Sequence, residues 1–380
     1  MRLVKLSLWL LLSFPFLAVG TSQYNLPVGV TDISRDVYEL HMTIFYICCV
    51  IGLVVFAIMF WAIIHHRKSK GAVPAQFHES TKIEILWTAI PFIILIGMAV
   101  PATKALIKME DTSKADLTIK ITGSQWKWHY EYLTYEGKKV DVDFYSIMST
   151  TQEQITNKET KGEHYLLEVD KPLVIPTDKK VRFLITSDDV IHSWWIPDFA
   201  VKKDANPGFI NESWTRVNTP GTYRGQCAEL CGKDHGFMPV VVVAKAPTEF
   251  DTWLNESQEE KKNAAQADQA LLSQILSKEE LMTLGEQVYM SSCAACHQPT
   301  GLGLPGVFPA LKASPIALGD VNKHIDMVLH GTPGTAMQAY AKQLTLKQLA
   351  AIVTYERNAW GNDTGDLVQP SQIKSRLGDE

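Results

Sequence analysis

The chain has few cysteines and no excess of positive charge. The 380 residues carry 36 Lys and Arg against 41 Asp and Glu, a formal net charge of −5. This balance gives no sign of a nucleic-acid-binding surface, so no nucleic-acid partner is expected. Four of the six cysteines fall in two short motifs, and Cys48 and Cys49 lie in an apolar run. No thiols are left over for a conventional disulfide framework. The length predicts two or three domains.

Soft metal ligands are concentrated between Cys227 and Met238, where the sequence reads C-A-E-L-C-G-K-D-H-G-F-M. Cys227, Cys231 and His235 are spaced four residues apart, and Met238 follows. Thiolate, thioether and imidazole together suit copper. A zinc ion held by two Cys and one His, or a disulfide outside the cytoplasm, would also explain the thiols. Met238 favours copper, because zinc has little use for a thioether.

The same loop resembles the binuclear copper (Cu-A) loop of cytochrome c oxidase subunit II. The upstream segment D-D-V-I-H-S-W-W-I-P resembles the family strand that carries the remaining ligand, here His192. The resemblance implies six ligands: Cys227 and Cys231 bridging both coppers, His192 and His235 each on one copper, and Met238 and the Glu229 backbone carbonyl as axial ligands. A potential set by the axial ligand and the surroundings of the sulfurs would then be expected.

Two further roles follow from this resemblance. In the family, a Glu at the position of Glu229 helps to hold Mg²⁺ at the contact with subunit I, and one carboxylate suffices because Mg²⁺ keeps several waters. The segment S-Q-W-K-W-H-Y-E-Y also resembles the family, in which a Trp at the position of Trp126 receives electrons from a docking cytochrome. From the residues alone, a Trp half-buried in a strand fits equally well.

Two long apolar runs predict a transmembrane helix hairpin over 38–106. Met42 to Ile64 carries no Asp, Glu, Lys or Arg, and a second run extends from Ile85 to Thr103. Both are long enough to span a bilayer. The basic cluster between them predicts a cytoplasmic connection, which would leave the rest of the chain in the periplasm of a bacterium, anchored to its inner membrane.

The N-terminus has the pattern of a secretory signal peptide over 1–20. Arg2 and Lys5 precede an apolar core, and small residues follow at Ala18 to Gly20. An uncleaved membrane anchor is the alternative. The core is short for a membrane span, which favours cleavage.

Glu84 opens the second apolar run. Thr81 and Glu84 have the spacing of a capping box at a helix start. An ionisable group at the end of a membrane helix is also a functional candidate. The resemblance to subunit II implies a Glu near the start of a proton pathway into subunit I, and both roles can coexist.

Residues 107–246 contain short β-like runs rich in β-branched and aromatic residues, such as K-V-R-F-L-I-T and M-P-V-V-V-V-A. Turn signals at 206–208 and 220–221 separate them. These patterns predict an all-β Greek-key sandwich or barrel, and the resemblance implies a cupredoxin-like copper domain. Residues 247–277 are largely polar and rich in Ala, and we expect a linker with helical character.

Cys293-Ala-Ala-Cys296-His297 matches the attachment pattern of a c-type haem. The two thiols would add across the haem vinyl groups, and His297 would bind the iron. A thioredoxin-like C-x-x-C has no βαβ pattern around it here. A zinc site would need more ligands than this neighbourhood offers.

The second iron ligand must come from later in the chain. We expect Met337, which lies in a Gly- and Pro-rich stretch, because a thioether with an imidazole raises the haem potential. Met327 and His330 are rivals. Predicted helices over 278–292 and 345–358 complete an all-helical domain over 278–361, of which 280–361 resembles a class I cytochrome c. Residues 362–380 read as a mobile tail.

The three parts together resemble subunit II of a caa-type cytochrome oxidase, in which a cytochrome c domain is fused to the copper domain. The resemblance implies the subunit through which electrons enter a haem-copper oxidase. A donor cytochrome or reductase complex would reduce the haem, which would pass electrons to the copper pair. Subunit I, accompanied by other oxidase subunits, would reduce oxygen to water. Tethering would give an effective concentration on the order of millimolar.

Other classes of protein remain to be separated from this one. A free-standing, membrane-anchored electron carrier would share both redox motifs. A nitrous oxide reductase has similar copper ligands, but its large catalytic domain has no room in 380 residues. A copper-free quinol-oxidase subunit is excluded if the loop binds metal.

Overall fold

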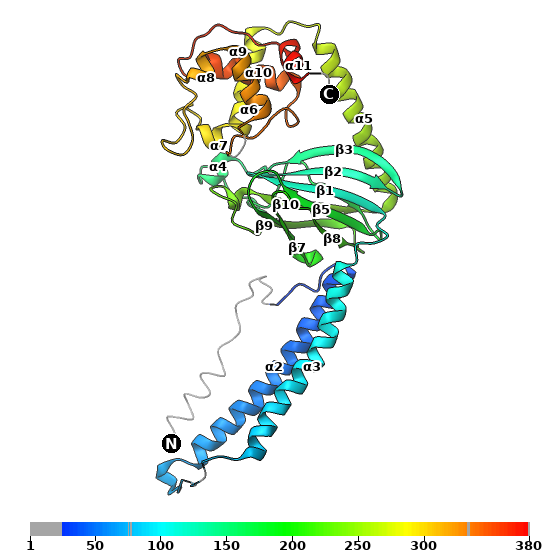
Figure 1. Ribbon diagram of the computed structural model, residues 1–380, viewed down its shortest axis with the longest axis vertical. Coiled ribbons are helices and arrows are strands. Elements are labelled where there is room, and N and C mark those ends of the chain that lie inside the picture. The colour runs from blue at the N-terminus through cyan, green and yellow to red at the C-terminus, as the bar shows by residue number, and fades with distance from the viewer. Residues whose placement is uncertain (1–24, 75, 77, 333–334, 379–380) are drawn as a thin grey trace.

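The computed structural model describes residues 25–74, 76, 78–332 and 335–378. Three parts follow one another along its long axis: a helix pair, a β-sandwich and a small helical domain (Figure 1). This arrangement confirms the predicted multi-domain fold class of helix hairpin, all-β domain and all-α domain. The proposed signal peptide, 1–20, lies outside the described residues.

The helix pair consists of α2 (Asp32–His65) and α3 (Thr81–Glu110), joined through a short 3₁₀ turn, η1 (Lys68–Lys70). Both helices are long and apolar enough to cross a membrane, and none of their most apolar stretch is buried by the rest of the chain. The connection between them lies at the end farthest from the sandwich (Figure 1). These exposed apolar side chains therefore have to be covered by lipid or by protein partners.

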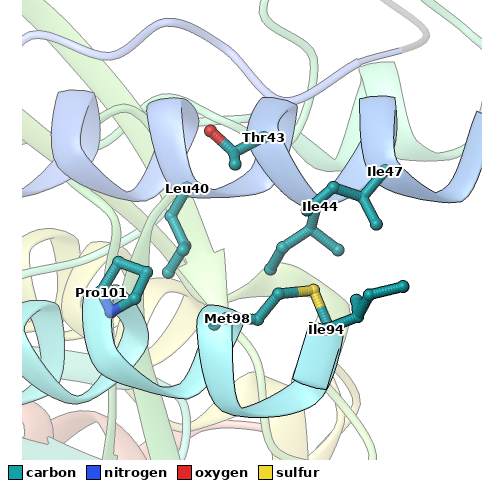
Figure 2. Close-up of a pocket in the computed structure, with 8 residues that line it drawn as sticks. Leu40, Thr43, Ile44, Ile47, Ile94, Met98 and Pro101 are labelled. Carbon is teal, nitrogen blue, oxygen red and sulfur yellow. The ribbon is translucent and has the colours of Figure 1, made fainter. Parts of the chain in front are cut away.

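Figure 2 shows how the two helices meet. Leu40 and Ile44 of α2 face Met98 and Pro101 of α3 across an apolar groove. Gly97 also lines this groove. A small residue at a membrane helix interface lets two backbones approach closely.

The expected capping box at the start of α3 is wrong in detail. The N-cap is Ser80 rather than Thr81, and its side chain makes no cap bond. The Glu84 carboxylate instead accepts a hydrogen bond from the Ser80 backbone nitrogen at 3.3 Å. The helix begins one residue earlier than expected, and Glu84, still in its first turn, caps the backbone nitrogen of Ser80.

Two five-stranded sheets form the sandwich, with strand orders β3-β2-β1-β5-β8 and β4-β10-β9-β6-β7. The strands are β1 (Leu117–Ser124), β2 (Lys127–Tyr135), β3 (Lys138–Ser146), β4 (Leu173–Pro176), β5 (Val181–Ser187), β6 (His192–Ile196), β7 (Val201–Ala205), β8 (Asn211–Thr215), β9 (Gly221–Cys227) and β10 (Pro239–Lys245). β1 pairs with β5 in parallel, and so does β10 with β4. Short helical turns lie between strands: α4 (Gln152–Ile155), η2 (Pro197–Phe199) and η3 (His235–Phe237).

The sandwich core is aromatic. Trp128, Tyr130, Phe183 and Trp194 are all fully buried. Burial alternates residue by residue along β5, as expected for a strand with one face on the core. Buried aromatic rings of this size contribute much of the hydrophobic stabilisation of such a domain.

The sandwich is held against the helix pair by polar contacts. The Trp214 indole donates to the Lys108 carbonyl at the end of α3, at 3.1 Å. The Thr31 hydroxyl, which caps α2, donates to the Phe199 carbonyl at 3.2 Å. These two contacts therefore fix the sandwich at one end of the helix hairpin.

The expected linker is helical over α5 (Pro247–Leu271). Its first turns belong to the sandwich, since Phe250 and Leu254 are buried in that core. Farther along, Lys261 forms ion pairs with Asp141 and Asp143 on β3, at 2.6 and 2.5 Å. A polar, Ala-rich sequence favours helix, and the two buried residues attach it.

The C-terminal domain contains α6 (Lys278–Ser292), α7 (Ala294–His297), α8 (Pro315–Leu318), α9 (Val321–His330), α10 (Leu346–Asn358) and α11 (Pro370–Leu377). α6 crosses α10 at Gly285, where an added Cβ would lie 2.3 Å from the Ala351 carbonyl oxygen. Capping boxes at Ser277 and Thr345 begin these two helices. The helices expected at 278–292 and 345–358 are confirmed.

The expected mobile tail is wrong for the residues described. α11 packs onto the helical domain, with Ile373 and Val368 fully buried. Arg357 pairs with Asp366, and Arg376 pairs with Asp326 of α9. The polar composition suggested a tail, but two apolar side chains suffice to dock a two-turn helix.

Ile373→Ala should therefore destabilise the helical domain by about 3 kcal/mol, because it removes a buried aliphatic side chain and leaves a cavity. Chemical denaturation followed by haem-region absorbance would measure the change. Ser371→Ala, an exposed position on the same helix, is the control. Equal stability of both variants would contradict the packing of α11.

Candidate functional site

The copper motif folds into a loop between β9 and β10, beside the start of β6. Cys227 ends β9, and His192 begins β6. The donor atoms of His192, Cys227 and Cys231 all lie within 4.8 Å of one another, and all three side chains are buried. The two sulfurs are 3.8 Å apart. Soft donors are thus gathered out of water before any metal binds.

An imidazole nitrogen lies beside each sulfur. His192 Nδ1 is 3.9 Å from the Cys227 sulfur, and His235 Nδ1 is 3.5 Å from the Cys231 sulfur. This near-symmetric arrangement of two thiols and two imidazoles fits two metals that share the sulfurs. A single tetrahedral zinc would not need the additional donors described next.

Two weaker donors lie in the same loop. The Glu229 carbonyl oxygen is 3.3 Å from the Cys227 sulfur. Met238 is buried, and its carbonyl accepts a hydrogen bond from the Cys227 nitrogen at 3.0 Å. The Glu229 side chain, in contrast, is exposed. The loop therefore turns one backbone carbonyl inward and one carboxylate outward.

Strand pairing brings the distant His192 to this loop. β6 pairs with β9 so that Trp194 lies opposite Cys227. The ring of His192 also needs space on β1: an added Cβ at Gly123 would lie 3.0 Å from two of its ring atoms. Gly123 is thus a close-approach glycine that makes room for a predicted ligand.

Asp189 orients His192. Its carboxylate is 2.9 Å from Nε2 of His192, which leaves Nδ1 facing Cys227. Burial alone would lower the pKa of His192, but the bonds to Asp189 and Cys227 outweigh it and raise the pKa. Second-shell carboxylates commonly fix metal-bound imidazoles in this way. Sequence reasoning did not assign Asp189 this role, although its position three residues before His192 was an available signal.

The two thiols are electrostatically unlike. The hydrogen bond with Cys231 holds the pKa of Cys227 far below its usual range, to about 3. The same contact raises the pKa of Cys231. A cation near both sulfurs would stabilise both thiolates.

Trp126 lies directly against the copper loop. The half-buried indole donates to the Cys231 carbonyl at 3.3 Å, and the Gln125 amide donates to the same oxygen at 2.8 Å. A partly exposed aromatic ring is thus connected to Cys231 through one hydrogen bond. Glu84 lies far from this site, exposed near the start of α3 at the other end of the hairpin (Figure 1).

The haem-attachment motif lies at the end of α6 and on α7. Cys293 is buried and Cys296 is half-buried. His297 Nδ1 donates to the Pro309 carbonyl at 2.9 Å, which leaves Nε2 available to bind iron. Pro309 was not expected from the sequence as the orienting partner. Fixing one ring nitrogen in this way sets which nitrogen faces the metal.

The candidates for the second iron ligand differ in their contacts. Met337 is half-buried on the loop after α9. The Met327 sulfur accepts a hydrogen bond from the Thr332 hydroxyl at 3.1 Å, and His330 is exposed. Among the described residues, the Met337 sulfur accepts no hydrogen bond, whereas the Met327 sulfur does.

Apolar side chains beside His297 also fit a haem. Leu302 and Val307 are 56% and 63% exposed, and they line an open apolar pocket together with Phe308 and Pro309. A hydrophobic macrocycle would cover such surface. The residues present therefore fit both a copper pair and a haem.

Comparison with known proteins gives the same division of the chain. Residues 20–105 match the family "Cytochrome C oxidase subunit II, transmembrane domain", and 117–245 match "Cytochrome C oxidase subunit II, periplasmic domain". Residues 280–355 match "Cytochrome C oxidase, cbb3-type, subunit III".

Two of the individual proteins to which the chain is similar are named as probable cytochrome c oxidase subunit 2. The chain is 42% identical over 225 residues to one from Rickettsia conorii, covering 59% of this chain and 68% of that one. It is 41% identical to one from Rickettsia bellii, covering 59% and 80%. Among solved structures, the periplasmic domain of subunit II of cytochrome oxidase from Bradyrhizobium japonicum is 40% identical, with a TM-score of 0.34. That match covers 39% of this chain and 98% of that one.

Gly123→Ala should weaken copper binding at least tenfold, because the added methyl group would displace the His192 ring by its close contact. Copper titration of the metal-free protein would measure the affinity. Gly162→Ala, where an added Cβ meets nothing within 4 Å, is the control in the same domain. Unchanged copper affinity in Gly123→Ala would show that His192 is not a ligand.

Proposed function

The chain belongs to the cytochrome c oxidase subunit II family, and from this premise we propose how its residues perform the family's task. It is a membrane-anchored oxidase subunit with a Cu-A domain and a haem domain, and electrons enter the oxygen-reducing complex through it. The observation that carries the proposal is the pair of buried sulfurs 3.8 Å apart, each with an imidazole nitrogen beside it.

The copper-binding residues divide the work. Cys227, Cys231, His192 and His235 would hold two coppers. Met238 and the Glu229 carbonyl would be weaker ligands of the same pair. The buried position of most of these side chains excludes water, and the strand pairing holds them rigidly. Rigid, dry ligands keep the geometry the same in both oxidation states.

The haem-binding residues would be Cys293 and Cys296 as covalent attachments, with His297 and Met337 as iron ligands. Pro309 holds the ring of His297 in place. The bound haem and copper pair supply reversible one-electron chemistry to the oxidase. Trp126, whose indole bonds to the Cys231 carbonyl, would shorten the path for electrons into the copper loop.

The membrane hairpin would place both redox domains on the periplasmic side of a bacterial inner membrane, by the basic connection between α2 and α3. Exposed apolar residues of these helices would pack on subunit I. The exposed carboxylate of Glu229 would contribute to a Mg²⁺ site at that contact, and Glu84 would lie near the start of a proton pathway. The electron donor would be a cytochrome or a reductase complex.

A free-standing electron carrier is the second candidate function. Against it, the chain matches oxidase subunit II over both its membrane part and its periplasmic part. Co-purification of the full chain with a large polytopic subunit would support the oxidase assignment, and purification as a lone chain would support the carrier.

The first experiment is metal analysis and electron paramagnetic resonance of the full-length chain in detergent, produced with the haem-attachment machinery. We expect two coppers sharing one unpaired electron, plus a haem that stays bound under denaturing conditions. One zinc, or no metal and a Cys227–Cys231 disulfide, would overturn the copper assignment.

Met238→Leu should retain both coppers but shift their midpoint potential, because an axial thioether is a weak ligand that tunes rather than holds the metal. Potentiometric titration would measure the shift, and metal analysis would measure the copper content. Complete loss of copper would show that Met238 is a principal ligand.

Met337→Leu should lower the haem midpoint potential and abolish the sulfur-to-iron absorption band, because it removes a thioether that stabilises the reduced iron. Met327→Leu is the matched control and should retain both properties. If the two variants exchange these behaviours, Met327 is the ligand.

A further inference from the structure

The copper loop contacts the haem-attachment motif directly. Lys233, which lies between Cys231 and His235, donates from Nζ to the Ala295 carbonyl at 3.1 Å. Ala295 lies between the two haem-attaching cysteines. One hydrogen bond therefore connects the loop proposed to hold copper with the helix proposed to hold haem.

A second contact joins the Met337 segment of the helical domain to the sandwich. Gln338 follows Met337, and its side-chain amide donates to the Gln125 carbonyl at 2.6 Å. The same amide nitrogen is 3.4 Å from Oδ2 of Asp189. Asp189 also accepts a bond from the Gln125 nitrogen and holds His192. The segment after the proposed iron ligand thus meets the residues that support a copper ligand and Trp126.

Lys127 lies between these contacts. It donates to the Gln343 side chain and lies over the Tyr340 ring, 5.1 Å from the ring centroid. Removal from water lowers the pKa of Lys127 to about 8. Lys127 of the sandwich is thus packed against two residues of the haem domain.

The contacts share a simple geometry. Both haem-ligating segments of the helical domain, the attachment motif and the Met337 loop, face the copper end of the sandwich, where α7 lies near its edge (Figure 1). The contacts between the two domains are few and polar, as in transient electron-transfer complexes, and they do not form a large apolar surface. The α5 helix, attached to the sandwich by Phe250 and Leu254, keeps the partner close.

We propose that the copper domain carries a docking surface for its own haem domain, made by Lys233 and the Gln125–Lys127 segment, and that Lys233 and Gln338 are positioning residues for electron transfer within the chain. The partner is the tethered domain, not an external cytochrome, which would have to deliver electrons to the haem. This inference rests on the proposed function, since it needs both cofactors.

The test uses the full-length chain in detergent with both cofactors bound. A light pulse with a photoreductant delivers one electron to the haem, and absorbance follows its reoxidation together with copper reduction. The double variant Lys233→Ala/Gln338→Ala should slow this step about tenfold, because the two hydrogen bonds from these side chains no longer hold the docked state.

The matched control is Lys312→Ala/Gln274→Ala. Both side chains are exposed on the haem-domain side of the chain, and neither makes a hydrogen bond or ion pair among the described residues. This variant should keep the original rate. Hydrogen–deuterium exchange should rise at 124–127 and 337–343 in the docking variant alone.

A charged variant separates docking from a structural effect. Gln338→Glu places a carboxylate against Asp189, and the rate should fall at low salt and recover in part at high salt, because salt screens the repulsion. An original rate in the double variant, with copper and haem intact, would overturn the docking surface. Absence of haem-to-copper transfer in the unmodified chain would instead overturn the proposed function.

Discussion

The antiparallel pairing of β6 with β9 is the constraint on which the copper site depends. It sets Trp194 opposite Cys227 and so brings His192 beside a loop that lies more than thirty residues later in the sequence. The pairing is stabilised by the buried aromatic core beneath it. Asp189 then fixes which ring nitrogen of His192 faces the sulfurs. The arrangement of the proposed metal ligands is therefore fixed by the sandwich and not by the loop alone.

The sandwich also connects the other two parts of the molecule. One end of the sandwich is joined to the membrane helices through Trp214 and Thr31, and the copper end meets the haem domain. Asp189 connects the copper end of the sandwich with the haem domain, because its carboxylate contacts both His192 and Gln338. Under the proposed docking, a displaced haem domain would act on the proposed copper ligand His192 through this single carboxylate.

Local motifs were readable because their chemistry lies within a few residues. The C-A-E-L-C-G-K-D-H-G-F-M and C-A-A-C-H segments predicted soft-metal and haem chemistry from ligand type and spacing. The membrane helices were readable from uninterrupted apolar runs. Predictions were wrong where packing overrode composition: α11 is polar in sequence yet docks through Ile373, and the start of α3 is capped at Ser80, one residue before the expected position.

By itself, the sequence determined the order of the domains, the classes of cofactor and nearly all of the proposed ligands, because each of these is encoded in local spacing, hydrophobicity or a recognisable family motif. Only the tertiary structure decided what supports those ligands. The roles of Asp189, Gly123 and Pro309, and the meeting of Lys233 with Ala295, depend on strand register and on domain contacts between residues far apart in the chain. No local pattern records such contacts, since long-range packing brings the partners together.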